Sequence, residues 1–63
     1  MKNIYEVEVD TESVKYVTRI FGLPEAVKEC TEASKCANVL EATVTDRETG
    51  EIILRMIDGV AAK

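Results

Sequence analysis

The sequence contains no histidine and no tryptophan, and only three of its 63 residues are aromatic. Without histidine there is no imidazole base and no histidine-ligated metal site. The sequence also has no Ser/His/Asp or Cys/His set, no phosphate-binding glycine-rich loop and no calcium-binding loop. We therefore expect no catalytic residues, no metal, no cofactor and no small-molecule ligand, and so a protein that is not an enzyme.

Long apolar runs and secretion signals are also missing. No apolar run approaches the ~20 residues of a membrane-spanning helix. Charged residues interrupt the N-terminal segment at Lys2 and Glu6, which argues against a signal peptide. The two cysteines, Cys30 and Cys36, are separated by five residues, which is neither a redox-motif nor a zinc-ribbon spacing. We expect reduced thiols in a cytoplasmic protein, with Cys30 in the core and Cys36 at the edge of a helix. An exposed Cys36 thiol that cross-links two chains is the alternative.

Composition and charge indicate one small globular domain over residues 1–63. Apolar residues make up 46% of the chain and charged residues 32%. A chain of this length buries only ~60% of the surface that it exposes when unfolded, so its stability is expected to be marginal. The net charge of −4 argues against electrostatic binding to nucleic acid or to an anionic membrane.

The first half of the chain shows the alternation of a half-buried β-hairpin. In residues 3–9 apolar side chains alternate with Glu6 and Glu8, which is the period of a strand. Residues 14–21 are rich in β-branched and aromatic residues, which favours a strand, although a helix capped by Asp10 or Thr11 is the alternative. Pairing Val9 with Val14 places Glu8 opposite Lys15 and supports the strand.

A helix and a second hairpin follow. Pro24 suits a first helical position, and small apolar residues recur at helical spacing until Asn38, which is expected to end the helix in a left-handed conformation. Residues 39–45 and 51–57 flank a polar loop that ends at Gly50, a hairpin with Gly50 at positive φ. Pairing Val44 with Ile52 puts the apolar residues on one face and sets Glu41 opposite Arg55.

These elements predict an α+β fold of the order ββαββ. Two β-hairpins form a four-stranded sheet, one helix packs on one of its faces, and residues 58–63 form a flexible tail. The sequence does not determine the order of the strands in the sheet. The expected core consists of Tyr5, Val7, Val9, Val14, Tyr16, Ile20, Leu23, Val27, Cys30, Leu40, Ala42, Val44, Ile52, Leu54 and Met56.

The uncovered face of this sheet is the candidate functional surface. Charged residues are interleaved there with six apolar residues, which is more than a solvated face of a small protein requires. The predicted interface residues are Ile4, Val17, Phe21, Val39, Ile53 and Ile57. We expect a non-catalytic protein–protein interaction module that forms a homodimer or binds another protein. A free sheet edge is a second route to pairing.

An acidic regulator of nucleic-acid machinery is the alternative function. Acidic residues alternate along the first strand and line the exposed side of the helix, where they could imitate a phosphate backbone. They are Glu6, Glu8, Asp10, Glu12, Glu25, Glu29 and Glu32. Weak direct binding of nucleic acid is the other form of this alternative, although one aromatic residue among acidic side chains makes a poor stacking platform.

Two segments resemble those of short bacterial or phage-borne ββαββ proteins. The first is Phe21-Gly22-Leu23-Pro24-Glu25-Ala26-Val27-Lys28, which joins a strand to a helix start. The second is residues 42–53, in which Val44, Asp46 and Thr49-Gly50-Glu51 form a similar hairpin. The resemblance covers most of the chain and implies a bacterial or mobile-element origin and a cytoplasmic setting. It assigns no functional residue. Leu23 stands where those proteins have a polar helix cap.

Overall fold

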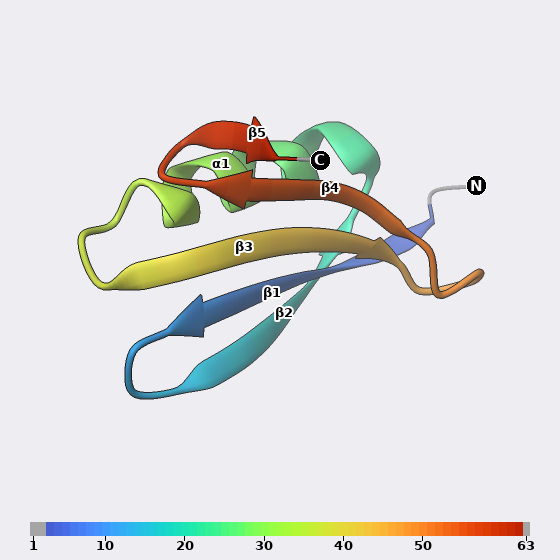
Figure 1. The fold of residues 1–63 in the computed structure, drawn as a ribbon. Helices are drawn as coiled ribbons and strands as arrows, with labels where there is room; N and C mark the ends of the chain where they lie inside the picture. The colour runs from blue at the N-terminus through green and yellow to red at the C-terminus, as the bar shows by residue number, and fades with distance from the viewer. Residues whose placement is uncertain (1–2, 63) are drawn as a thin grey trace.

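The chain forms one antiparallel sheet with a single helix packed against it. The computed structural model describes residues 3–62. Its elements, in chain order, are β1 (Ile4–Thr11), β2 (Lys15–Phe21), α1 (Leu23–Ser34), β3 (Val39–Asp46), β4 (Ile52–Ile57) and β5 (Val60–Ala62). The α+β class is confirmed, but the sheet has five strands instead of the predicted four, in the order β2-β1-β3-β4-β5 (Figure 1).

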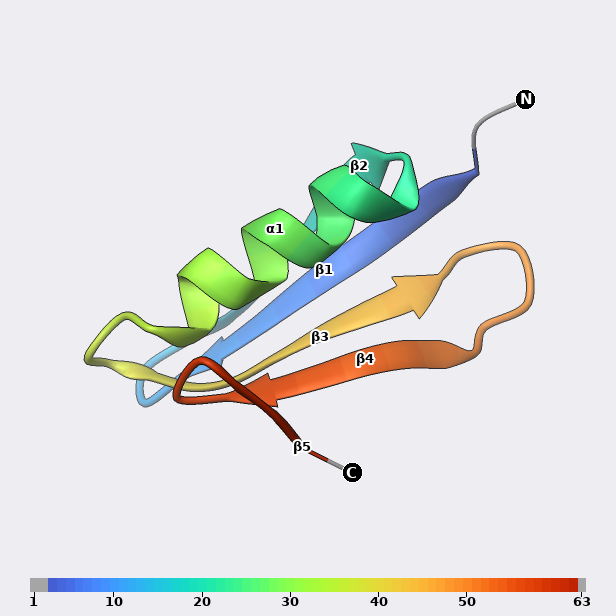
Figure 2. The ribbon, with the colours of Figure 1, turned by 90° about the horizontal axis from the view of Figure 1, so that it is seen from above.

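Helix α1 covers the middle of the sheet. It runs along the direction of β1, as Figure 2 shows, and packs mainly against β1 and β3. The buried core accordingly joins these two strands and β4 to the helix. It consists of Tyr5, Val7, Val9, Ala26, Cys30, Ala42, Val44 and Met56, with Ile20, Leu23, Ala33, Val39 and Leu54 partly buried around it.

The β1–β2 hairpin closes through the side chain of Thr11. The Thr11 hydroxyl accepts a hydrogen bond from the Val14 amide at 2.9 Å and donates one to the Val14 carbonyl at 2.7 Å. Val9 therefore lies opposite Tyr16, two residues away from the predicted partner Val14. A shift of two residues preserves the faces of both strands, so the apolar side chains of β1 still point to the helix. The helical alternative for residues 14–21 is wrong.

Two β-bulges alter the predicted β3–β4 hairpin. Asp10 pairs with Glu41 and Thr11 with Val39, so Leu40 is an extra residue in β3. Val44 pairs with Leu54 and Thr45 with Ile52, so Ile53 is an extra residue in β4. Gly50 has the predicted positive φ of 77°.

The bulges and the altered register overturn five sequence assignments. The side chains of Leu40 and Ile52 are each 52% exposed, although both were expected in the core. Val39 packs partly against the core instead of lying on the uncovered face. Val44 lies opposite Leu54 instead of Ile52, and Arg55 lies opposite Thr43 instead of Glu41. The side chains of Arg55 and Glu41 nevertheless form the expected opposite-charge pair, 3.5 Å apart.

Strand β5 replaces the predicted tail over residues 60–62. Asp58 and Gly59 both have positive φ, 56° and 79°, as a two-residue turn of type I′ requires. The Gly59 amide donates a hydrogen bond of 3.1 Å to the Ser34 hydroxyl, which in turn donates to the Thr31 carbonyl at 2.9 Å. The turn is thereby attached to the end of α1. Lys63 lies outside the described residues.

Helix α1 is capped by backbone conformation at both ends. Gly22, at φ 89°, occupies the N-cap position without a side-chain hydrogen bond, so the cap is Gly22 and not Leu23. The helix ends at Ser34, and Lys35 follows it with right-handed backbone angles. The prediction of a left-handed Asn38 at the helix end is wrong, because Asp58 is the one residue other than glycine with positive φ in the described chain.

Candidate interaction surface

The sheet face opposite α1, here called the open face, is defined by the strand registers. Its residues alternate with those of the core along each strand. They are Ile4, Glu6, Glu8 and Asp10 on β1, Lys15, Val17, Arg19 and Phe21 on β2, Glu41, Thr43 and Thr45 on β3, Ile52, Arg55 and Ile57 on β4, and Val60 and Ala62 on β5.

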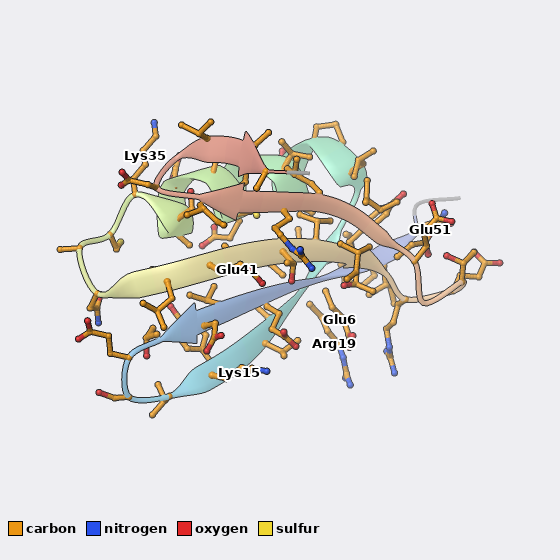
Figure 3. The ribbon with its side chains drawn as sticks, in the orientation of Figure 1. Glu6, Lys15, Arg19, Lys35, Glu41 and Glu51 are labelled. Atoms are coloured by element: carbon orange, nitrogen blue, oxygen red, sulfur yellow. The ribbon has the colours of Figure 1, made fainter. Side chains whose placement is uncertain are left out.

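Ion pairs occupy the centre of the open face. Glu6 is shared by two arginines, with Arg19 Nε and Arg47 Nε each 3.6 Å from its Oε2. Lys15 Nζ lies 3.9 Å from Glu8 Oε2, and Arg55 Nε lies 3.5 Å from Glu41 Oε2. Figure 3 shows Glu6 and Arg19 side by side. Because these side chains are between 31% and 62% exposed to solvent, each pair contributes about 0–1 kcal/mol to stability.

The charges of the open face cancel. The acidic residues Glu6, Glu8, Asp10 and Glu41 are balanced by Lys15, Arg19, Arg47 and Arg55. The net charge of −4 therefore arises from the helix, the loops and the termini. A second copy that approaches this face meets no excess of one sign of charge.

The charged side chains also cover the strands beneath them. Thr43 is only 6% exposed although no helix lies over it. The Nε atom of Arg55 is buried beside Glu41 and makes no hydrogen bond of good geometry. The centre of the open face is therefore packed by its own polar side chains, and the apolar residues lie to either side.

Exposed apolar residues on β2 form one side of the open face, here called the β2 group. Val17 is 50% and Phe21 63% exposed, and Phe21 lies opposite the half-buried Ile4. An open hollow of about 530 Å³ lies beside them, lined by Glu6, Val17, Thr18 and Arg19. Since Thr18 belongs to the helix side of the sheet, the hollow extends around the free edge of β2.

A second apolar set, the β4–β5 group, lies on the other side of the face. Ile52, Ile57 and Val60 are 52%, 45% and 67% exposed. A hollow of about 270 Å³ near this group is lined by Ile52, Ile53, Leu54, Arg55 and Ala62. The sequence alternation could not identify Ile52 and Val60 as residues of the open face. The bulge at Ile53 reverses the face to which Ile52 points, and Val60 lies in β5, a strand that was not predicted.

The six predicted interface residues do not form one patch. Ile4, Val17 and Phe21 lie together at the β2 side. Ile57 lies in the β4–β5 group, and the bulged Ile53, 42% exposed, lines the hollow near it. Val39 lies on the helix side.

The helix side also leaves apolar residues uncovered. Val14 and Tyr16, both assigned to the core from the sequence, are 59% and 49% exposed. Tyr16 lies opposite the buried Val9, on the same side of the sheet as α1. The helix leaves Tyr16 half exposed, because α1 packs mainly on β1 and β3 and less on β2.

The two thiols differ in accessibility. Cys30 is fully buried in the core, as predicted, and Cys36 is exposed just beyond the helix. Burial disfavours the thiolate and raises the pKa of Cys30 above its ordinary value of 9.0. We therefore expect iodoacetamide to modify Cys36 in the native protein and Cys30 only after unfolding, as mass spectrometry would show. Rapid modification of both thiols under native conditions would contradict the buried position.

The raised pKa of Cys30 also implies a pH effect on stability. The folded state holds the proton more tightly, so this contribution is complete below about pH 9 and is lost as the pH rises through the folded-state pKa. Urea unfolding should show a smaller alkaline loss of stability in Cys30→Ala than in the wild type. An equal loss in both proteins would assign the effect to other groups.

Residues 3–62 contain no cluster of three or more His, Cys, Asp or Glu residues that could hold a metal ion. In the same part of the chain, no helix is long and apolar enough to cross a membrane. No protein-family model, curated protein or solved structure matches the sequence.

Proposed function

We propose that this protein is a non-catalytic protein–protein interaction module that self-associates through its open face. The observation that carries the proposal is the arrangement of that face, with a charge-balanced centre between two exposed apolar groups. Closed homodimers are the commonest protein assemblies, and self-association would add buried apolar surface to a small core. We also propose a cytoplasmic setting, which suits two cysteines that form no disulfide.

The acidic-regulator alternative has weaker support. Glu6 and Glu8, which belong to the acidic run on β1, are paired with cations and offer little free negative charge. Glu25, Glu29 and Glu32 remain exposed on α1, so mimicry of a phosphate backbone would have to use the helix.

Solution mass tests the proposal directly. Light scattering coupled to size exclusion, over a concentration series with reductant, should show a dimer that dissociates on dilution. At least one of Phe21→Ser, in the β2 group, and Ile53→Ser, beside the β4–β5 group, should shift the equilibrium toward monomer by removing exposed apolar contacts, while circular dichroism shows an intact fold. Lys28→Ser, on the exposed surface of α1, is the control and should associate like the wild type. A monomer at every concentration, or unchanged association in both folded variants, would refute the proposal.

A further inference from the structure

Strand β2 is a long free edge of the sheet. It has seven residues, of which only Ile20 is even partly buried, whereas the opposite edge strand β5 has three. An unpaired edge presents a row of backbone N–H and C=O groups to any strand that approaches. Charged side chains normally protect such edges from pairing.

The two cations of β2 do not protect its edge. Lys15 is drawn inward toward Glu8, and Arg19 toward Glu6, both of which lie on the neighbouring strand β1. Both charged groups therefore lie over the open face, on the side of β2 that faces β1. Approach of another strand meets backbone groups and the apolar side chains Val17 and Phe21.

The hydrogen-bonding pattern identifies the backbone groups that are free. Gly22 donates to the Asn3 carbonyl and Thr11 to the Val14 carbonyl, so the even-numbered residues of this segment bond to β1. Because antiparallel strands alternate in this way, Lys15, Val17, Arg19 and Phe21 direct their backbone groups outward.

From these observations we propose that two copies of the chain pair through their β2 strands, antiparallel and centred on Thr18. This inference rests on the proposed self-association and assigns it to the β2 side of the open face. A two-fold axis perpendicular to the sheet keeps both helices on the same side and produces one continuous ten-stranded sheet. Lys15 then lies opposite Phe21 of the second copy, and Val17 opposite Arg19 of the second copy.

The order of residues in β2 favours this register over its neighbours. A pairing centred on Val17 places Lys15 against Arg19, and one centred on Arg19 places two arginines face to face. Like charges directly opposite one another are destabilising in a sheet. The register centred on Thr18 avoids both contacts and uses the whole strand from Lys15 to Phe21.

The same register accounts for the uncovered residues on the helix side. Tyr16 would lie opposite Ile20 of the second copy, a residue packed against the core of that copy. The 49% exposure that its own helix leaves to Tyr16 would therefore decrease on pairing.

Cross-linking tests the register. At the centre of the pairing, Thr18 faces its own copy in a non-hydrogen-bonded pair, where Cα atoms lie ~4.5 Å apart and within disulfide range. In a Cys36→Ser background, Thr18→Cys should form a disulfide-linked dimer on mild oxidation. Lys15→Cys is the control within β2, because its two copies would be ~20 Å apart along the strands. Val60→Cys, on the other edge of the sheet, is the second control and should also remain uncross-linked.

A backbone variant provides an independent readout. Val17→Pro removes an outward amide that β1 does not use, and proline is tolerated at such positions of edge strands. We expect it to remain folded and to weaken the dimer at least tenfold. A dimer that is unaffected by Val17→Pro and leaves Thr18→Cys uncross-linked would overturn the edge pairing but not self-association. A wild-type chain that stays monomeric would overturn both proposals.

Discussion

Val7→Ala should cost about 2–3 kcal/mol of folding free energy, which is a large part of what this protein has. Val7 is fully buried at the centre of β1, beneath the helix and opposite Val44 on β3. Removing two methyl groups loses their transfer free energy and leaves a cavity that two flanking strands prevent from closing. A domain of this length is expected to have a stability of roughly 3–9 kcal/mol.

Val17→Ala is the matched control for this substitution. The same two methyl groups are removed from Val17 in the neighbouring strand β2, but this side chain is half exposed on the open face. At protein concentrations where the chain is monomeric, its replacement should alter stability by no more than about 0.5 kcal/mol. Urea unfolding followed by circular dichroism compares the two variants. Similar losses in both would mean that the sheet is not packed around Val7 as the structure shows.

The faces of the first hairpin were predictable because strand alternation has a period of two. Tyr5, Val7 and Val9 are all buried, and Glu6 and Glu8 lie on the open face. The register was not predictable from alternation alone, since a shift of two residues leaves every face unchanged. The Thr11 side chain, by bonding to both backbone groups of Val14, selects the shorter turn.

The second hairpin shows where alternation fails. A bulge inserts one residue and reverses the faces beyond it, so Val39 turns toward the core and Ile52 away from it. Nothing in residues 39–57 marks Leu40 or Ile53 as the extra residue. The bulge at Leu40 depends on the pairing of β3 with β1, which is a contact between distant parts of the chain. The bulge at Ile53 lies within the β3–β4 hairpin itself.

The sequence predicts which face of the sheet is the candidate site, but not how the charged and apolar side chains are arranged on it. The sequence identified the open face and four of its apolar residues, Ile4, Val17, Phe21 and Ile57. It missed Ile52 and Val60, and it could not show that ion pairs separate two apolar groups. The charge pairs Glu8–Lys15 and Glu41–Arg55 were predicted from the sequence. The sharing of Glu6 by two arginines was not, because it depends on the β1–β2 register and on where the loop after β3 lies. The exposure of Tyr16 depends on which strands α1 covers, which is a tertiary property.

The turn at Asp58-Gly59 was predictable from the sequence, since Asp-Gly is among the strongest signals for a two-residue hairpin turn. It was missed because the four residues that follow it were assigned to a flexible tail. Its importance is testable through Gly59→Ala, which places a Cβ atom at φ 79° and 2.9 Å from the Lys35 Cγ atom. The left-handed conformation costs roughly 1–2 kcal/mol for a residue other than glycine. Displacing Lys35 and disturbing the Gly59–Ser34 hydrogen bond should add to this loss.

Gly50→Ala separates these contributions, because Gly50 has nearly the same φ of 77° but nothing within 4 Å of an added Cβ. Both variants should lose the roughly 1–2 kcal/mol that the left-handed backbone conformation costs alanine, and Gly59→Ala should lose more free energy of unfolding in urea. Equal losses would show that Lys35 moves aside freely and that the Ser34 contact adds nothing. If Gly59→Ala were as stable as the wild type while Gly50→Ala was not, β5 would not unfold together with the rest of the sheet. The pair of variants therefore measures whether the last strand is an integral part of the fold.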